Sequence, residues 1–109
     1  MKQTFNIGIA EKYGVRSAVI VSLMIDFCRS AANCDDYKLE GKVFVPYFEI
    51  RRFAPYMNSH EFGVGLRNLI YHKIIQVITP INMGRCYIFT DHAKELFSKK
   101  PIRIHICWQ

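Results

Sequence analysis

The stretch from Asn58 to Phe89 constrains the fold more than any other part of the chain. Asn58 is a favourable helix N-cap, and Glu61 follows three residues later, as in a capping box. Apolar residues then recur at the three- and four-residue steps that place side chains on one face of an α-helix. They are Phe62, Leu66, Leu69 and Ile70. The sequence therefore predicts an amphipathic helix over residues 58–73.

Two β-prone segments follow this helix directly. Ile74–Ile78 and Arg85–Phe89 are rich in β-branched and aromatic residues. Pro80, Asn82 and Gly84 lie between them and supply residues that favour turns. The pattern predicts a β-hairpin with a long tip, entered immediately from the helix.

The segment from Val15 to about Ala32 contains no Pro or Gly and predicts a second helix. Its apolar residues cover most of the helix circumference rather than one stripe. Such a helix needs more than one neighbour, so it either runs through the middle of the domain or packs against the same helix of a second copy. In a chain this small, we expect a homodimer formed through Val15–Cys28.

The other N-terminal segments predict shorter elements. A short helix is expected over Phe5–Lys12, ended by Gly14, because glycine tolerates the left-handed turn that closes helices. Residues 33–41 are polar and acidic, and predict a surface loop. Lys42–Val45 is β-prone.

A further helix is expected over Tyr47–Tyr56. Pro46 fits its first turn, where the missing N–H costs nothing, and Pro55 ends it. Four of its apolar residues are expected to face inward, and Glu49 outward with the two arginines. The inward set is Phe48, Ile50, Phe53 and Ala54.

Two elements are expected after the hairpin. Thr90 or Asp91 can cap a last helix that runs through Phe97. Ile102–Trp108 alternates between apolar and other residues, and predicts a strand that pairs with the hairpin or with a partner subunit.

Charge is unevenly distributed along the chain. Residues 1–50 carry six Lys or Arg and six Asp or Glu, whereas residues 51–109 carry nine Lys or Arg and three Asp or Glu. The second half therefore accounts for the whole net charge, 9 − 3 = +6. A basic face attracts polyanions, and nucleic acid is the usual one. A generally basic surface is the alternative, and charge alone does not separate the two.

The chain lacks the motifs that would indicate an enzyme. At 109 residues it predicts one domain, and it contains no G-x-S-x-G, P-loop or G-x-G-x-x-G motif. Gly63-Val64-Gly65 resembles the start of a glycine fingerprint, but no strand precedes it and no third glycine follows. We therefore expect no catalytic residues and no cofactor.

The four cysteines are Cys28, Cys34, Cys86 and Cys107. They have irregular spacing and form no C-x-x-C pair, which argues against a metal site. Cys28 and Cys86 fall at apolar positions, which indicates reduced thiols and a cytoplasmic setting. A disulfide between Cys28 and Cys34 is the alternative. The apolar run at residues 18–25 is far shorter than the roughly 20 residues that span a bilayer, so no membrane partner is expected.

The segment Val45–Phe97 resembles the winged helix-turn-helix domains of phage and bacterial replication-initiator and regulator proteins. It reads VPYFEIRRFAPYMNSHEFGVGLRNLIYHKIIQVITPINMGRCYIFTDHAKELF. Residues 9–27, IAEKYGVRSAVIVSLMIDF, are similar to the helix that precedes the motif in that group. Three features depart from the group. Lys73 replaces a glycine before the wing, and Gly63 and Gly65 lie inside the recognition helix, at a cost of about 1 kcal/mol each relative to alanine. The recognition helix also offers only Arg67, with His60, Asn68 and Ser59, as base-reading candidates.

The resemblance implies a single α+β domain, mainly α, with a two- or three-stranded β-wing. N-terminal helices would occupy residues 1–33, the helix-turn-helix 42–73, and the wing 74–90. A C-terminal helix would occupy residues 91–100, and a tail or extra strand 101–109.

The resemblance also implies binding to double-stranded DNA, in a regulatory or replication-related role. Arg67 would contact a guanine edge in the major groove and Asn68 an adenine. Arg51 and Arg52 would hold phosphates, and Arg85 would place the wing at the adjacent backbone or minor groove. The remaining residues expected at the DNA are Ser59, His60, Gly63 and Lys73.

A winged helix that binds protein is the competing hypothesis. The two glycines, the small number of base-reading side chains and the largely apolar second helix favour an adaptor or inhibitor that does not bind DNA. Salt dependence separates the two, because phosphate contacts weaken steeply with added salt and an apolar interface does not.

Overall fold

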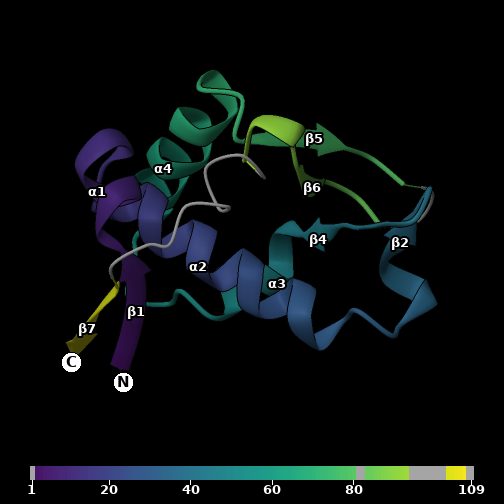
Figure 1. Cartoon of the computed structure of the whole chain (residues 1–109), viewed down its shortest axis with the longest axis horizontal. Helices are drawn as coiled ribbons and strands as arrows, with labels where there is room; N and C mark the ends of the chain where they lie inside the picture. The colour runs from purple at the N-terminus through teal and green to yellow at the C-terminus, as the bar shows by residue number, and fades with distance from the viewer. Residues whose placement is uncertain (1, 81–82, 94–102, 108–109) are drawn as a thin grey trace.

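Helix α2 (Val15–Ser30) crosses the middle of the molecule, and the other helices and sheets pack around it (Figure 1). The computed structural model describes residues 2–80, 83–93 and 103–107. The fold is α+β and mainly helical, with small antiparallel sheets. The other elements, in chain order, are β1 (Lys2–Asn6), α1 (Ile7–Tyr13), the 3-10 helix η1 (Asp35–Tyr37), β2 (Lys38–Leu39), β3 (Lys42–Val43), β4 (Val45–Pro46), α3 (Tyr47–Arg52), α4 (Ser59–Tyr71), β5 (Ile75–Ile78), β6 (Cys86–Phe89) and β7 (Arg103–Cys107).

The apolar circumference of α2 is explained within one chain. The helix contacts α1, α3, α4, β1 and β4, and every residue from Ser17 to Ser22 is buried, as is Met24. The first of the two expected arrangements therefore applies, since α2 runs through the middle of the domain. Its burial gives no support to the homodimer expected through Val15–Cys28, because those apolar side chains already have neighbours in the same chain.

The predicted hairpin is present and belongs to a three-stranded sheet. β5 pairs antiparallel with β6, and β6 also pairs with β4, which gives the strand order β4-β6-β5. Tyr87 in the middle strand faces Val77 on one side and Val45 on the other, and is 1% exposed. The short strand before α3 is thereby joined to the end of the hairpin that follows α4.

The second sheet was not predicted correctly. β1 pairs antiparallel with β7, in a register that places Lys2 opposite Cys107 and Asn6 opposite Arg103. Strand pairing by residues 102–108 was expected with the hairpin or a partner subunit, and a helix was expected from Phe5. The helix and the strand are both present, but α1 begins at Ile7 rather than Phe5, and β7 pairs with β1 instead of the hairpin or a partner subunit. The pairing was missed because the two strands lie at opposite ends of the chain and leave no local signal.

Residues 33–41 form more than the expected loop. The turn η1 leads into a small antiparallel hairpin of β2 and β3. Glu40 and Gly41 connect these strands, with φ angles of 53° and 80°. Two successive residues with positive φ are typical of the tight turns that match the twist of a hairpin.

Helix α3 is shorter than expected, and two of its apolar residues face outward. It ends at Arg52 rather than Tyr56. Ile50 and Ala54 are buried as predicted, but Phe48 is 55% exposed and Phe53 52% exposed. The inward placement of the two phenylalanines is therefore wrong.

Both ends of α4 have defined caps. The backbone N–H of Glu61 donates to Asn58 Oδ1 over 2.8 Å, and the N–H of Asn58 donates to Glu61 Oε1 over 3.4 Å, which confirms the predicted capping box. At the other end, the N–H of Ile74 donates to the carbonyl of Leu69, and that of Lys73 to the carbonyl of Ile70. These two bonds form a Schellman motif, with Lys73 at the left-handed position.

The start of the last predicted helix is also present. Residues 91–93 are helical, and the N–H of Ala93 donates to Thr90 Oγ1 over 3.3 Å. Of the two expected caps, Thr90 and Asp91, the structure shows Thr90 capping this helix. The rest of the predicted helix over residues 91–100 lies outside the described residues. In the part of the chain that the structure describes, no helix has the length and hydropathy needed to cross a membrane.

Replacing Lys73 by glycine should stabilise the fold. Lys73 has a φ of 59°, a conformation that costs an L-residue roughly 1–2 kcal/mol and costs glycine little. We expect Lys73→Gly to raise the free energy of unfolding by about 1 kcal/mol, measured by urea denaturation. Lys73→Ala removes the same charge but keeps a Cβ, so it serves as the control. Equal stability of the two variants would contradict the explanation.

Candidate functional site

The outward face of α4 is the surface that the sequence predicts to bind DNA. His60, Gly63, Arg67 and Tyr71 recur at steps of three and four residues; we call them the outer stripe of α4. His60 and Arg67 are exposed, Gly63 is half-buried, and Tyr71 is 81% exposed. The opposite face carries the buried residues of the helix, Phe62, Gly65, Leu66 and Leu69. Ser59 is exposed at the first position of the helix.

The one acidic residue of α4 is neutralised by its neighbours. Glu61 accepts the N–H of Asn58 at one oxygen and forms an ion pair with Arg16 at the other, over 3.2 Å. Arg16 comes from the first turn of α2, so this pair also joins the two helices. Because Glu61 is paired with Arg16, no acidic side chain of α4 is left to pair with Arg67.

Asn68 faces the interior of the fold rather than solvent. Its amide donates to the backbone carbonyl of Tyr13 over 2.5 Å and to Ser17 Oγ over 3.3 Å. Both donor hydrogens of the amide are thereby used to fix α4 against α1 and α2. Asn68 was expected to read an adenine edge, and these contacts give it a structural role instead.

The two glycines of α4 have different roles. A Cβ on Gly65 would lie 2.7 Å from Ile20 Cδ1, and the carbonyl of Gly65 accepts a hydrogen bond from Ser17 Oγ over 3.1 Å. A Cβ on Gly63 would meet only the Arg67 side chain, with Nη1 at 3.2 Å. Gly65 therefore allows α2 and α4 to approach closely, whereas Gly63 belongs to the outer stripe beneath Arg67.

The arginine pair of α3 is divided between two roles. Arg51 donates to the carbonyl of Ala54 over 2.6 Å, and its guanidinium carbon lies 5.2 Å from the centroid of the Phe62 ring. These contacts close the C-terminal end of α3. Arg52 is exposed and stacks over the neighbouring Phe53 ring at 5.5 Å. Of the two arginines expected at phosphates, Arg52 is the accessible one.

The hairpin contributes two exposed cations. Lys73 follows α4 directly, and Arg85 immediately precedes β6. The carbonyl of Arg85 accepts the N–H of Tyr47 over 3.0 Å, which fixes that end of the hairpin to the start of α3. Burial raises the pKa of Tyr87, and the hydrogen bond and charge of Arg85 oppose this effect.

The described residues offer little that points to catalysis or metal binding. Among them, no group of three or more His, Cys, Asp or Glu residues is placed to hold a metal ion. Cys28, Cys34 and Cys86 are free thiols, so the alternative disulfide between Cys28 and Cys34 is absent. Burial raises the pKa of Cys28 to about 11, which keeps it protonated and a poor nucleophile at neutral pH.

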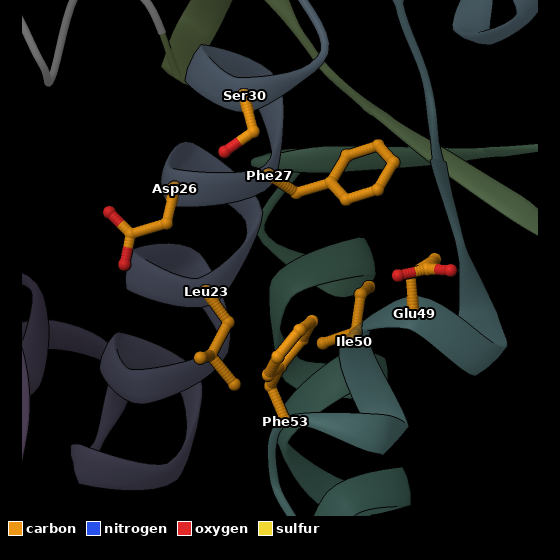
Figure 2. Close-up of a pocket in the computed structure, with 7 residues that line it drawn as sticks. All are labelled: Leu23, Asp26, Phe27, Ser30, Glu49, Ile50 and Phe53. Carbon is orange, nitrogen blue, oxygen red and sulfur yellow. The ribbon is translucent and has the colours of Figure 1, made fainter.

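Sequence reasoning missed a groove between α2 and α3. It has a volume of about 390 Å³ and is lined by Leu23, Asp26, Phe27, Ser30, Glu49, Ile50 and Phe53 (Figure 2). We call it the α2–α3 groove. The spacing of its α2 residues was visible in the sequence, but the outward position of Phe53 depends on where α3 ends.

Comparisons of the chain with protein-family models, with curated proteins and with solved structures found no match.

The two glycines of α4 make a matched test of the site geometry. Ile20 is fully buried, so Gly65→Ala must displace packed core atoms, at a cost of roughly 1–3 kcal/mol that outweighs the gain in helix propensity. Gly63→Ala should gain about 0.5–1 kcal/mol, because the exposed Arg67 side chain can move aside. We expect Gly65→Ala to be the less stable variant by about 2 kcal/mol in thermal or urea unfolding. The reverse order would show that α2 does not approach α4 at Gly65.

Proposed function

We propose that this chain is a winged helix-turn-helix that binds double-stranded DNA. The connectivity supports this assignment: helix α2, strand β4, helices α3 and α4, then the β5–β6 hairpin, with strand order β4-β6-β5. In that arrangement α4 is the recognition helix and the β5–β6 hairpin is the wing. The function of such a module is binding rather than catalysis.

The observation that carries the proposal is the uncompensated positive charge on the outward side of α4. Arg67 is exposed on the outer stripe, while Glu61 is paired with Arg16. A helix with this face fits the major groove, where an arginine can bind a guanine edge. Arg67 is the proposed base contact, with Ser59 and His60 beside it.

The exposed cations around α4 are the proposed phosphate contacts. Arg52 on α3, Lys73 at the junction and Arg85 on the wing are all exposed. Phosphate contacts fix orientation without reading sequence. Arg51 and Asn68 take no part in this proposal, because their side chains are bound within the fold.

The biological role that fits this activity is regulatory or replication-related, as in the phage and bacterial proteins that the sequence resembles. The free thiols Cys28, Cys34 and Cys86 are consistent with the reducing cytoplasm that we infer as the setting.

Removing Arg67 and Arg85 together should greatly weaken DNA binding. We expect Arg67→Ala/Arg85→Ala to lower the affinity for a fluorescently labelled random duplex at low salt by roughly tenfold or more. The slope of log K against log salt should also fall by about 0.9, because Arg85 is one proposed phosphate contact and each lost phosphate contact contributes about 0.9. Fluorescence anisotropy over a salt series measures both quantities.

The control removes the same charge from elsewhere. Arg29 at the end of α2 and Lys42 in β3 are exposed and lie outside α4 and the wing. Arg29→Ala/Lys42→Ala should change the slope far less. If both double variants bind equally well, or if the wild type does not shift a duplex at micromolar concentration, the proposal is refuted.

A protein-binding winged helix is the second candidate. The observation that favours it is the exposure of Tyr71, at 81%, beside Ile70, at 36%, on the helix that would face DNA. Aromatic and aliphatic side chains with this exposure suit a protein interface. Binding through them would change little with salt and would survive the loss of Arg67 and Arg85.

A further inference from the structure

The α2–α3 groove has an apolar floor built from two helix faces. Leu23, Phe27 and Ser30 recur along one face of α2, and the other side is formed by Ile50 of α3 and by Phe53, which follows the end of α3 (Figure 2). Ile50 is 2% exposed and forms the base, whereas Phe53 is 52% exposed and stands at the side. The groove has a volume of about 390 Å³, which lies within the range of ligand-binding clefts, roughly 300–1,000 Å³.

Two carboxylates flank this floor from opposite helices. Figure 2 shows Asp26 at the outer side of α2, with its carboxylate directed away from α3, and Glu49 on the α3 side of the apolar side chains. Within the described residues, neither carboxylate forms a hydrogen bond or an ion pair, whereas Glu61 and Asp35 are both paired with cations. A chain with a net charge of +6 thus keeps two uncompensated acids on one apolar groove.

Arg52 lies beside the groove lining. The guanidinium of Arg52 lies 5.5 Å from the centroid of the Phe53 ring. The residues that line the groove include no Lys or Arg. Their charged side chains are Asp26 and Glu49, which give the lining two negative charges.

We propose that the α2–α3 groove binds a basic peptide segment of a partner protein, with a large apolar side chain seated between Leu23 and Phe53. Lysines or arginines on either side of that anchor pair with Asp26 and Glu49. The mode is that of a short segment whose apolar residues fill a groove between helices. Charge complementarity at the rim sets which partners are accepted.

Other occupants fit this groove less well. Nucleic acid would be repelled by the two carboxylates. A second copy that docked the same groove on itself, as two-fold symmetry requires, would place Asp26 and Glu49 against like charges. A basic peptide satisfies both the apolar floor and the acidic rim.

The test uses a short amidated peptide in which Leu and Phe alternate with Lys and Arg, titrated into the 15N-labelled protein. We expect amide shifts confined to the second half of α2 and to α3. Asp26→Asn/Glu49→Gln should raise the dissociation constant of the peptide roughly five- to tenfold, because two partly exposed ion pairs are lost. Phe53→Ala should also raise the dissociation constant of the peptide.

Matched variants separate a groove effect from a change in net charge. Glu11 and Asp36 are exposed acids outside the groove, so Glu11→Gln/Asp36→Asn should change the dissociation constant less than twofold. Arg52→Ala should tighten peptide binding, whereas the same change should weaken DNA binding. The Arg67→Ala/Arg85→Ala variant should bind the peptide normally, so this proposal and the DNA proposal fail independently.

Several results would overturn the proposal. The rim has no role if a peptide with Glu in place of Lys and Arg binds equally well. The same conclusion follows if Glu11→Gln/Asp36→Asn weakens peptide binding as much as Asp26→Asn/Glu49→Gln does. Amide shifts centred outside α2 and α3, or no amide shifts at millimolar peptide, would show that the groove is not the peptide-binding site. A dimer in light scattering that Asp26→Asn/Glu49→Gln dissociates would assign the groove to a second copy.

Discussion

The close contact between α2 and α4 at Gly65 determines how the rest of the site is presented. Ser17 donates to the carbonyl of Gly65, and Asn68 donates to both Tyr13 and Ser17. These bonds connect a buried serine, the end of α1 and an amide of α4 in one polar cluster. Because they fix the rotation of α4 about its axis, Arg67, two residues beyond Gly65, faces outward. A larger residue at position 65 would separate the helices and loosen this orientation.

The same contact limits what the outer stripe can recognise. Asn68 is used within the fold, and Glu61 is used by the helix cap and by Arg16, so Arg67 is the main charged group that α4 presents. One arginine with Ser59 and His60 offers few base-specific hydrogen bonds. Recognition by such a helix would depend largely on phosphate contacts from Arg52, Lys73 and Arg85, and its sequence specificity would be low.

Local signals made α4 and the hairpin predictable from sequence. The pair Asn58 and Glu61 marks a helix start by itself, and the β-prone segments flank residues with strong turn preferences. Non-local contacts were not predictable: β1 pairs with a strand at the other end of the chain, and Gly63 and Gly65 look equivalent until the position of α2 is known. Phe53 likewise has an apolar side chain, and only the early end of α3 places it at the surface. The sequence therefore predicted the helix α4 that carries the candidate site, but not which of its polar side chains are bound within the fold.

Helix α3 is where the two proposed surfaces meet. Glu49 lines the α2–α3 groove, while Arg52, three residues later, adds to the cations near α4 and also stacks on Phe53. A ligand on either surface would change the electrostatic environment of the other, since a basic peptide in the groove neutralises acids close to Arg52. Screening limits such effects to about 10 Å at ordinary salt, and a helix of six residues is about 9 Å long. Occupancy of the groove by a basic segment would then add positive charge beside the proposed DNA-binding surface, so the two ligands would favour each other's binding.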